Sequence, residues 1–296
     1  MGCMDAPFDI TSLPTGVLMP LSPLVSRVLA PNPSPFTFTG TQSYFVGQTE
    51  LAVIDPGPAD PAHIAALMHG IAGRPVTAIL CTHTHRDHSP AARPLAAATG
   101  APVIGCAPLT LEDDGPRADA AFDPDYAPDH VLADGDRVAG SGWTLEAVAT
   151  PGHTSNHLCF ALLEEHALFT GDHVMGWSTT VVSPPDGNMA DYMRSMQRLI
   201  DRDDLVYYPA HGDAVEKPQR LARSMMGHRR HREGQILRHL ESGGSVAIAD
   251  MVADMYRGVD PRLHPAAGRS VLAHLLDLQT RGLTREHHGR WEAVAA

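Results

Sequence analysis

The chain has 296 residues, 43% of them hydrophobic, which is enough to bury a sizeable core as one large domain or as a core with an appendage. Its formal net charge is −12, and no apolar run approaches the roughly 20 residues of a membrane-spanning helix, so we expect no membrane contact. The first residues include neither a basic nor an apolar segment, which predicts no signal peptide and a cytoplasmic protein.

The charge is unevenly distributed along the chain. Residues 1–216 carry −17 and residues 217–296 carry +5, which predicts a catalytic domain over the first range and a second domain over the other. The chain contains four cysteines: Cys3, Cys81, Cys106 and Cys159. Their spacing is not that of a metal site, and we expect free thiols and no disulfide framework.

Short strands and helices alternate through the first domain. The expected strands are residues 24–29, 43–46, 51–54, 76–81, 103–105, 144–149, 158–163, 168–170 and 205–208. The expected helices are residues 60–70, 91–99 and 191–201. Asp60 and Ser89 are the expected N-caps of the first two helices, because each precedes a proline at the first turn. Residues 107–130 are acidic and rich in proline, which predicts a surface insertion that avoids an anionic substrate.

Metal-binding residue types gather in one stretch directly after the strand at residues 76–81. His83, His85, Asp87 and His88 lie within six positions, and imidazole and carboxylate groups suit zinc and related metals. The two histidines at alternate positions can face the same way, as they would on a strand. One catalytic zinc needs only three protein ligands and a water, so four donors this close indicate two metals.

Three further candidates, His153, Asp172 and His211, each follow a strand-like run and adjoin glycine or proline. The ordered set resembles the His-x-His-x-Asp-His signature and later ligands of the metallo-β-lactamase fold hydrolases. The resemblance implies an α/β fold, an αββα sandwich, with two metal sites. It assigns the ligands as follows: His83, His85 and His153 to the first metal, Asp87, His88 and His211 to the second, and Asp172 as the bridge.

The last 80 residues have a different character. An Arg- and His-rich helix is expected over residues 219–240, followed by helices over 246–256 and 265–281 and a β-ribbon over 283–294, which together are winged-helix-like. Two stretches, residues 32–41 and 228–237, resemble the β-lactamase-like protein 2 family, whose members join the metallohydrolase core to such a tail. The chain departs from that family at Gln42-Ser43-Tyr44, where Asn-Thr-Tyr is usual, which leaves substrate contacts there open.

Two adjacent zinc ions would acidify water, and a bridging hydroxide is then the expected nucleophile, with Asp87 and Asp172 as the catalytic carboxylates. Mn²⁺ and Fe²⁺ are the alternative metals. Two other residues, Asp55 and His157, are each open to two interpretations. Asp55 either orients the metal loop or bonds its own turn, and His157 either donates to an oxyanion or is structural.

We expect hydrolysis of a small, anionic ester, thioester or lactone. The alternatives are an endoribonuclease on single-stranded RNA, as in characterised animal members of the family, an iron-dependent sulfur dioxygenase-like enzyme, and a DNA-binding regulator. The −17 charge of the first domain disfavours nucleic acid. The cluster Arg229, Arg230 and Arg232 is expected to bind an anionic partner or substrate, and the tail is compatible with a homodimer.

Overall fold

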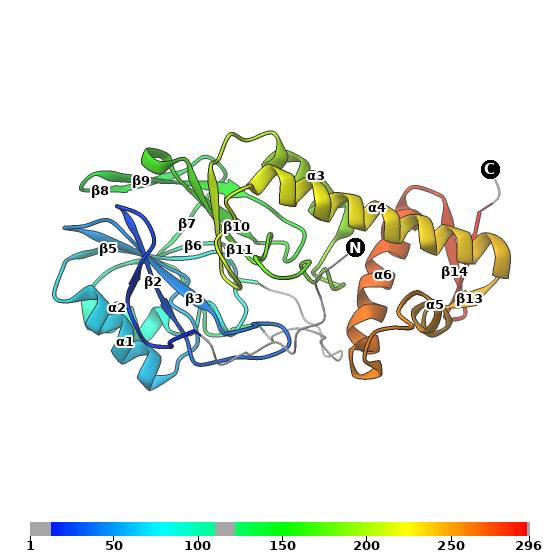
Figure 1. The fold of residues 1–296 in the computed structure, drawn as a ribbon, viewed down its shortest axis with the longest axis horizontal. Helices are drawn as coiled ribbons and strands as arrows, with labels where there is room; N and C mark the ends of the chain where they lie inside the picture. The colour runs from blue at the N-terminus through cyan, green and yellow to red at the C-terminus, as the bar shows by residue number, and fades with distance from the viewer. Residues whose placement is uncertain (1–12, 110–121, 295–296) are drawn as a thin grey trace.

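The computed structural model describes residues 13–109 and 122–294, which form two packed β-sheets, flanking helices and a helical tail (Figure 1). The first sheet has seven strands in chain order: β1 (Met19–Pro20), β2 (Val25–Leu29), β3 (Gln42–Val46), β4 (Leu51–Ile54), β5 (Val76–Cys81), β6 (Val103–Gly105) and β7 (His130–Val131). The second has five, ordered β12-β11-β10-β9-β8: β8 (Arg137–Gly140), β9 (Trp143–Ala149), β10 (Leu158–Leu162), β11 (Ala167–Gly171) and β12 (Val206–Pro209).

Parallel pairing brings the ends of several strands to one edge of the sandwich. In the first sheet β4, β5 and β6 are parallel neighbours, and in the second sheet β11 and β12 are parallel. The carboxyl ends of parallel strands lie at the same edge of a sheet. The residues that follow β4 and β5, and those that follow β11 and β12, are therefore delivered in neighbouring positions.

The core follows from the two-residue period of the strands. Along β10, Phe160 and Leu162 belong to the core between the two sheets, while Cys159 and Ala161 face the outer helical layer. The outer layers are α1 (Pro61–Ile71) and α2 (Ala92–Thr99) against the first sheet, and α3 (Met189–Ile200) against the second (Figure 1). The predicted αββα sandwich is confirmed.

The two predicted helix caps differ in outcome. Asp60 caps α1 as predicted, because its Oδ1 accepts a hydrogen bond from the His63 backbone N–H at 2.9 Å. The prediction for Ser89 was wrong, since the N-cap position of α2 belongs to Ala91. The Ser89 hydroxyl instead donates at 2.8 Å to Asp123, which lies 34 positions further along the chain.

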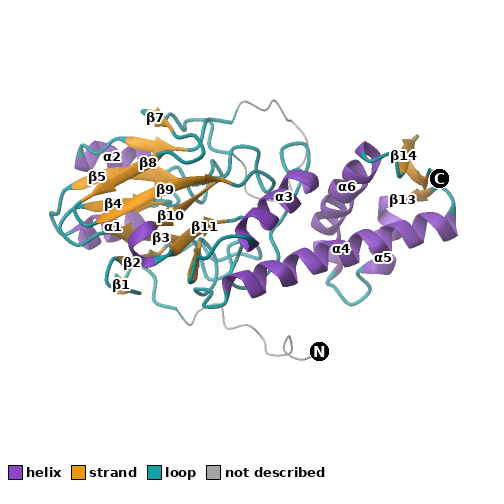
Figure 2. Cartoon of the chain, turned by 90° about the horizontal axis from the view of Figure 1, so that it is seen from above, coloured by secondary structure: helices purple, strands orange, loops and turns teal. Residues whose placement is uncertain are grey.

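The tail is built from α4 (Pro218–Gly243), β13 (Val246–Ala247), α5 (Ile248–Met255), a 3₁₀ turn (Pro261–Leu263), α6 (His264–Thr280), β14 (Thr284–His287) and β15 (Arg290–Ala293). Its strands form a separate sheet, ordered β13-β15-β14, and its helices bury their own core around Trp291 (Figure 2). The winged-helix-like prediction is confirmed. The helix predicted from residue 246 begins at Ile248, because Val246 and Ala247 pair with β15 instead.

Helix α4 belongs to both parts of the molecule (Figure 2). Ala222 and Met225, in its first turns, pack into the core behind the second sheet, whereas Ile236 and Leu240 pack into the tail core. The division predicted at residue 217 thus falls one residue before a helix that both cores share. Among the helices that the structure describes, none has both the length and the apolar composition needed to cross a membrane.

Two other predictions concern cysteines and the acidic segment. Cys81, Cys106 and Cys159 are free, buried thiols, as expected, and Cys3 lies outside the described residues. Residues 110–121 of the acidic segment also lie outside them. Most of the described residues of this segment lie at the surface, as predicted, but Tyr126 is only 6% exposed and Phe122 forms a β-bridge with His85, so the segment also reaches the metal loop.

Candidate metal centre

The stretch after β5 is held in place by Asp55, the residue that follows the neighbouring strand β4. One Asp55 oxygen accepts the Thr82 backbone N–H at 2.8 Å. The other accepts the Thr82 hydroxyl at 2.8 Å and contacts Nδ1 of His88 at 3.0 Å. Asp55 is 2% exposed, and all three side-chain contacts are to the metal loop rather than to the backbone of its own turn. Of the two interpretations of Asp55, orientation of the metal loop is the correct one.

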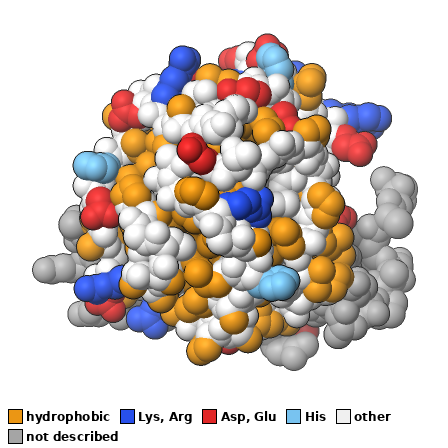
Figure 3. Space-filling view, turned by 90° about the vertical axis from the view of Figure 1, so that its left-hand side faces the viewer, with side chains coloured by type: hydrophobic (Ala, Val, Ile, Leu, Met, Phe, Trp, Pro, Cys, Tyr) orange, Lys and Arg blue, Asp and Glu red, His pale blue; other side chains and the backbone are white. Residues whose placement is uncertain are grey.

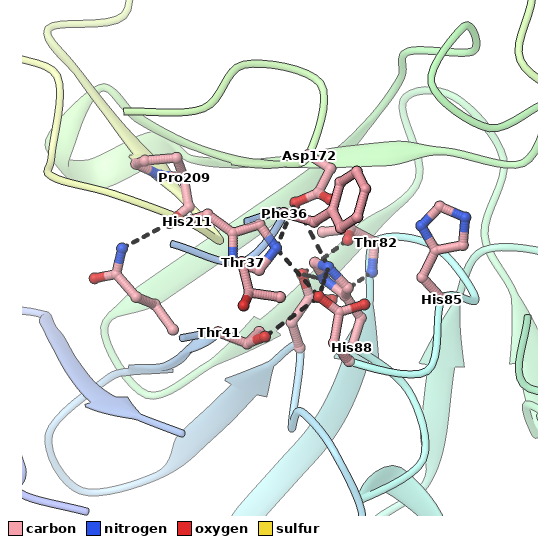
Figure 4. A network of polar contacts seen from close by, with 12 residues as sticks. Phe36, Thr37, Thr41, Thr82, His85, His88, Asp172, Pro209 and His211 are labelled. Carbon is pink, nitrogen blue, oxygen red and sulfur yellow. Dashed lines mark hydrogen bonds and ion pairs between the residues drawn. The ribbon is translucent and has the colours of Figure 1, made fainter. Parts of the chain in front are cut away.

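All seven candidate ligands come together in two adjacent donor sets. The first set is His83, His85, His153 and Asp172, and the second is Asp87, His88 and His211; within each, the donor atoms lie within 4.8 Å of one another. Asp172 connects the sets, because its Oδ2 lies 3.6 Å from His153 Nε2. Its Oδ1 lies 3.2 Å from His211 Nε2 (Figure 4).

The histidine rings are oriented by contacts on the side away from the cluster. Nδ1 of His153 bonds to the Val181 carbonyl at 2.6 Å, and Nδ1 of His211 bonds to the Gly40 carbonyl at 3.1 Å. These contacts, like that of His88 with Asp55, fix the tautomer and direct Nε2 into the cluster. His85 is reversed, since its Nδ1 lies 3.2 Å from Nε2 of His153.

The donor chemistry fits divalent cations. Nε2 of His88, Oδ1 of Asp87 and Oδ1 of Asp172 are buried without a hydrogen-bond partner among the described residues. Oδ1 of Asp172 lies 3.2 Å from Nε2 of His211 and 3.5 Å from Nε2 of His88, so these atoms have only other members of the cluster as polar neighbours. Buried polar atoms are normally satisfied, and a bound cation would satisfy these. Imidazole nitrogens and carboxylate oxygens suit zinc, iron and manganese, and each set offers at least three donors.

The two sets differ in charge in the metal-free protein. Burial, reinforced by the neighbouring His153, lowers the pKa of His85 to about 3, so this ring is a neutral ligand. Burial also disfavours a charged His211, but the adjacent Asp172 carboxylate raises its pKa to about 10. Burial would raise the pKa of Asp87, yet His88 beside it holds that pKa well below its usual value. Cations that bind there would replace the protons on His88 and His211 that balance the carboxylates of Asp87 and Asp172.

His157 is structural, which resolves the second open interpretation. Its Nδ1 bonds to the Thr150 hydroxyl at 2.9 Å, and its Nε2 accepts the Asp172 backbone N–H at 3.3 Å. With both nitrogens occupied and the ring 1% exposed, it cannot donate to an oxyanion. Gly171 adopts a φ of +48°, and a Cβ there would lie 2.7 Å from His157 Nε2, so glycine lets this ring reach Asp172.

Gln42 is buried and bonds to the loop that carries His211. Its amide nitrogen donates to the carbonyls of Pro209, at 3.2 Å, and Gly212, on either side of His211. Arg27 donates to the amide oxygen from the opposite side. The residue that departs from the family pattern therefore holds the His211 loop, and it is 1% exposed.

Aromatic side chains lie in segments that adjoin the cluster, since Phe122 contacts His85, and Gly176, which precedes Trp177, pairs with Gly212, which follows His211. The ring of Phe122 is 4.9 Å from that of His85. Phe38 stacks on Trp177 at 4.7 Å, and Phe36 and Trp177 are each 37% exposed. The loop that carries Phe36 lies beside His211 and Asp172 (Figure 4). In the sequence these residues fall in the stretch 32–41, where aromatic and hydroxyl side chains alternate at 36–39 as on a strand, although the structure forms turns there.

Comparison with known proteins agrees with this geometry. Residues 36–211 match the family model of the metallo-beta-lactamase superfamily, and residues 247–291 match that of the beta-lactamase associated winged helix domain. A beta-lactamase-like protein 2 homolog of Caenorhabditis elegans is 31% identical over 278 residues, which cover 90% of this chain and 88% of that protein.

Two further similarities concern a named enzyme and a solved structure. An atrochrysone carboxyl ACP thioesterase of Aspergillus fumigatus is 33% identical over 226 residues, covering 75% of this chain and 66% of the enzyme. The crystal structure of a beta-lactamase domain protein from Burkholderia ambifaria superposes with a TM-score of 0.79 at 21% identity, covering 97% of each chain. The second similarity shows that the fold extends over both parts of the molecule.

Proposed function

Because the chain belongs to the metallo-β-lactamase superfamily and is a metal-dependent hydrolase, we propose that it hydrolyses a thioester or ester with an apolar acyl group, using two zinc ions. The observation that carries the proposal is the pair of buried donor sets connected by Asp172. The iron-dependent dioxygenase-like alternative keeps the same donor residues, so the number and kind of bound metals separate it from hydrolysis. Fe²⁺ and Mn²⁺ suit the same donor types, so the metal is part of what the experiment tests.

The residues of the chain have distinct roles in this proposal. Two ions bound there would supply an acidified water as nucleophile and would polarise the carbonyl oxygen of the substrate. Asp172 would hold the two sets at a fixed separation, and Asp87, whose Oδ2 contacts the Thr41 hydroxyl at 3.4 Å, would complete the second set. Ser89 is excluded as a nucleophile, because it is 1% exposed and its hydroxyl is bonded to Asp123.

The surroundings of the cluster support an acyl substrate. Phe36, Phe38, Phe122 and Trp177 offer apolar contact area, and burying one aromatic group stabilises a complex by about 1.5–3 kcal/mol. Figure 3 shows the side of the catalytic domain that faces away from the tail, and on that side the Lys and Arg side chains are scattered rather than gathered in a basic patch. The relative that aligns with 75% of this chain at 33% identity is named an atrochrysone carboxyl ACP thioesterase. Its name thus refers to a thioester, the class of bond proposed for this chain.

The proposal is tested with purified protein in two steps. Metal content is measured first, and then kcat/KM is compared for N-acetylcysteamine thioesters with naphthoyl and acetyl groups, a lactone, a phosphodiester and single-stranded RNA. We expect about two metals per chain, loss of activity with a chelator, and at least a tenfold preference for the aromatic thioester over acetyl. Full activity without metal, or cleavage of RNA with no thioesterase activity, would refute it.

RNA cleavage is the second candidate, because exposed arginines follow one side of α4: Arg223, Arg230 and Arg238. Phosphate binding depends on such cationic groups and weakens steeply with salt. The DNA-binding alternative is disfavoured by the tail itself. α6 follows α5 in the position of a recognition helix, yet its Ala273 packs into the catalytic-domain core and its Arg269 donates to Ser183 at 3.1 Å.

A further inference from the structure

Arg229 lies at the contact between the tail and the catalytic domain. It belongs to α4, is 4% exposed, and stacks over the ring of Tyr192 in α3, with 5.3 Å from Cζ to the ring centroid. Its Nη2 donates to the backbone carbonyl of Thr180, and its Nη1 donates to the Ser270 hydroxyl of α6 at 3.3 Å. A single guanidinium therefore joins two helices of the tail to a loop of the catalytic domain.

That loop also holds the first donor set. The Thr180 hydroxyl donates to the backbone carbonyl of Asp172 at 2.8 Å and to that of His173 at 3.0 Å. The next residue, Val181, accepts the hydrogen bond from Nδ1 of His153. Arg229 is thus connected to Asp172 through two hydrogen bonds, both made by Thr180. It is connected to His153 through Thr180 and the next residue, Val181.

We propose that Arg229 is a positioning residue for the metal centre, and that the tail thereby contributes to metal binding by the catalytic domain. By fixing the Thr180 carbonyl, the guanidinium holds the backbone of Thr180 and Val181 in the orientation that bonds Asp172 and His153. Without it the loop loses its anchor on one side, and both ligands lose a fixed partner. The inference rests on the proposed function in one respect, namely that the donor sets bind metal.

Burying an arginine between helices costs free energy, because its charge loses contact with water. In Arg229, Nη1 and Nη2 each donate a hydrogen bond, but Nε is buried without a partner among the described residues. An apolar side chain of similar volume often stabilises a buried position as well or better. The neighbouring buried positions of α4, Ala222, Met225 and Met226, are apolar as expected. What arginine adds at position 229 is directed donation to a carbonyl, which packing alone cannot supply.

The test compares Arg229→Met with Arg232→Met. Arg232 is the matched control, because it lies in the same helix but donates to Gln235 at 2.9 Å and to Met255 O at 3.3 Å, both within the tail. Co²⁺ affinity and the cobalt absorption spectrum are measured in an Asp87→Ala background, which removes one donor from the second set. Arg229→Met should weaken Co²⁺ binding by about 10- to 100-fold and alter the spectrum, as expected for groups that orient ligands, whereas Arg232→Met should change the affinity less than twofold.

Two additions keep the result decisive. Guanidinium ion at millimolar concentration should restore Co²⁺ affinity in Arg229→Ala, and Arg229→Lys, which keeps the charge but loses the forked donor, should be intermediate. If Arg229→Met fails to fold by circular dichroism, Arg229→Lys carries the comparison. Wild-type affinity and spectrum in a folded Arg229 variant would overturn the inference. Absence of Co²⁺ binding by the parent protein would overturn the proposed function instead.

Discussion

Residues 82–88 and residues 228–232 are both short stretches dense in one kind of side chain, and the fold treats them in opposite ways. In the first stretch His83, His85, Asp87 and His88 converge on two adjacent points. In the second, Arg229 is buried against the catalytic domain, Arg230 is exposed, and Arg232 lies over the Tyr256 ring at 4.3 Å. The predicted arginine cluster is wrong as a surface, because its members have three different environments.

The difference lies in the backbone that carries each stretch. A loop that leaves a strand keeps alternate side chains on one side, so His83 and His85 stay together. On a helix successive residues are about 100° apart, so adjacent arginines must diverge. Arg229 lies seven residues after Ala222 and three after Met226, and thus on the buried side of α4. That spacing was the signal that could have identified it.

The strongest test of the convergence of residues 82–88 is to replace Asp172, the residue that connects the two donor sets. Asp172→Asn should lower kcat by about a thousandfold or more, since it weakens both donor sets and metal ions supply several kcal/mol of transition-state stabilisation. Steady-state kinetics together with metal analysis measures this. Ser89→Ala is the control and should keep kcat within about threefold. Comparable losses in both variants would mean that the loss does not come from the carboxylate that connects the two sets.

A smaller effect is expected one contact further out. Asp55→Asn keeps the shape of the side chain but replaces an acceptor that the Thr82 hydroxyl and His88 share. Metal affinity at the second set should fall by about 10- to 100-fold, with little change at the first. Competition with a chromophoric chelator resolves the two affinities. Equal weakening of both sets would show that convergence depends on the whole loop, not on the His88 ring.

Much of this arrangement could be predicted from the sequence, for local reasons. The strands have clear apolar patterns, and each candidate ligand immediately follows one of them. The contacts that orient the ligands could not be predicted, because they join distant segments: Gln42 with Pro209, and Arg229 with Thr180. A hydrogen bond across 167 positions leaves no period in the sequence. Ser89 failed as a predicted cap for the same reason, since its partner Asp123 is a tertiary neighbour.

The contact between α4 and α6 also predicts acid sensitivity, because the buried His274 of α6 lies near Arg229 of α4. His274 is 2% exposed, and burial, reinforced by Arg229, lowers its pKa to about 3 from an ordinary value of 6.5. Below pH 6.5 the unfolded chain binds a proton that the folded chain does not, so the free energy of unfolding decreases as the pH falls toward 3. For this one group the loss between pH 7.5 and 5.5 is about 1.4 kcal/mol.

Urea unfolding of His274→Leu at those two pH values should show a loss smaller than that of wild type by that amount. Leu275→Ala, next to it in α6, is the control, because it lowers stability equally at both pH values. An unchanged pH dependence in His274→Leu would mean that this ring is not the group held neutral beside Arg229.

The smallest effect is expected on the exposed side of α4, and it separates the two candidate functions. Arg223, Arg230 and Arg238 are spaced by seven and eight residues and are all exposed, so they form a cationic face, whereas the predicted cluster does not.

If the substrate is a neutral thioester, Arg→Gln at all three positions should change kcat/KM less than about threefold at physiological salt, because exposed charges are screened there. If the substrate is RNA, the same change should reduce affinity several-fold and lower the slope of log K against log salt by about 2, since single-strand binding loses about 0.7 per phosphate contact. Measuring both substrates across a salt series with this variant therefore decides whether α4 acts only through its buried arginine, or through the exposed ones as well.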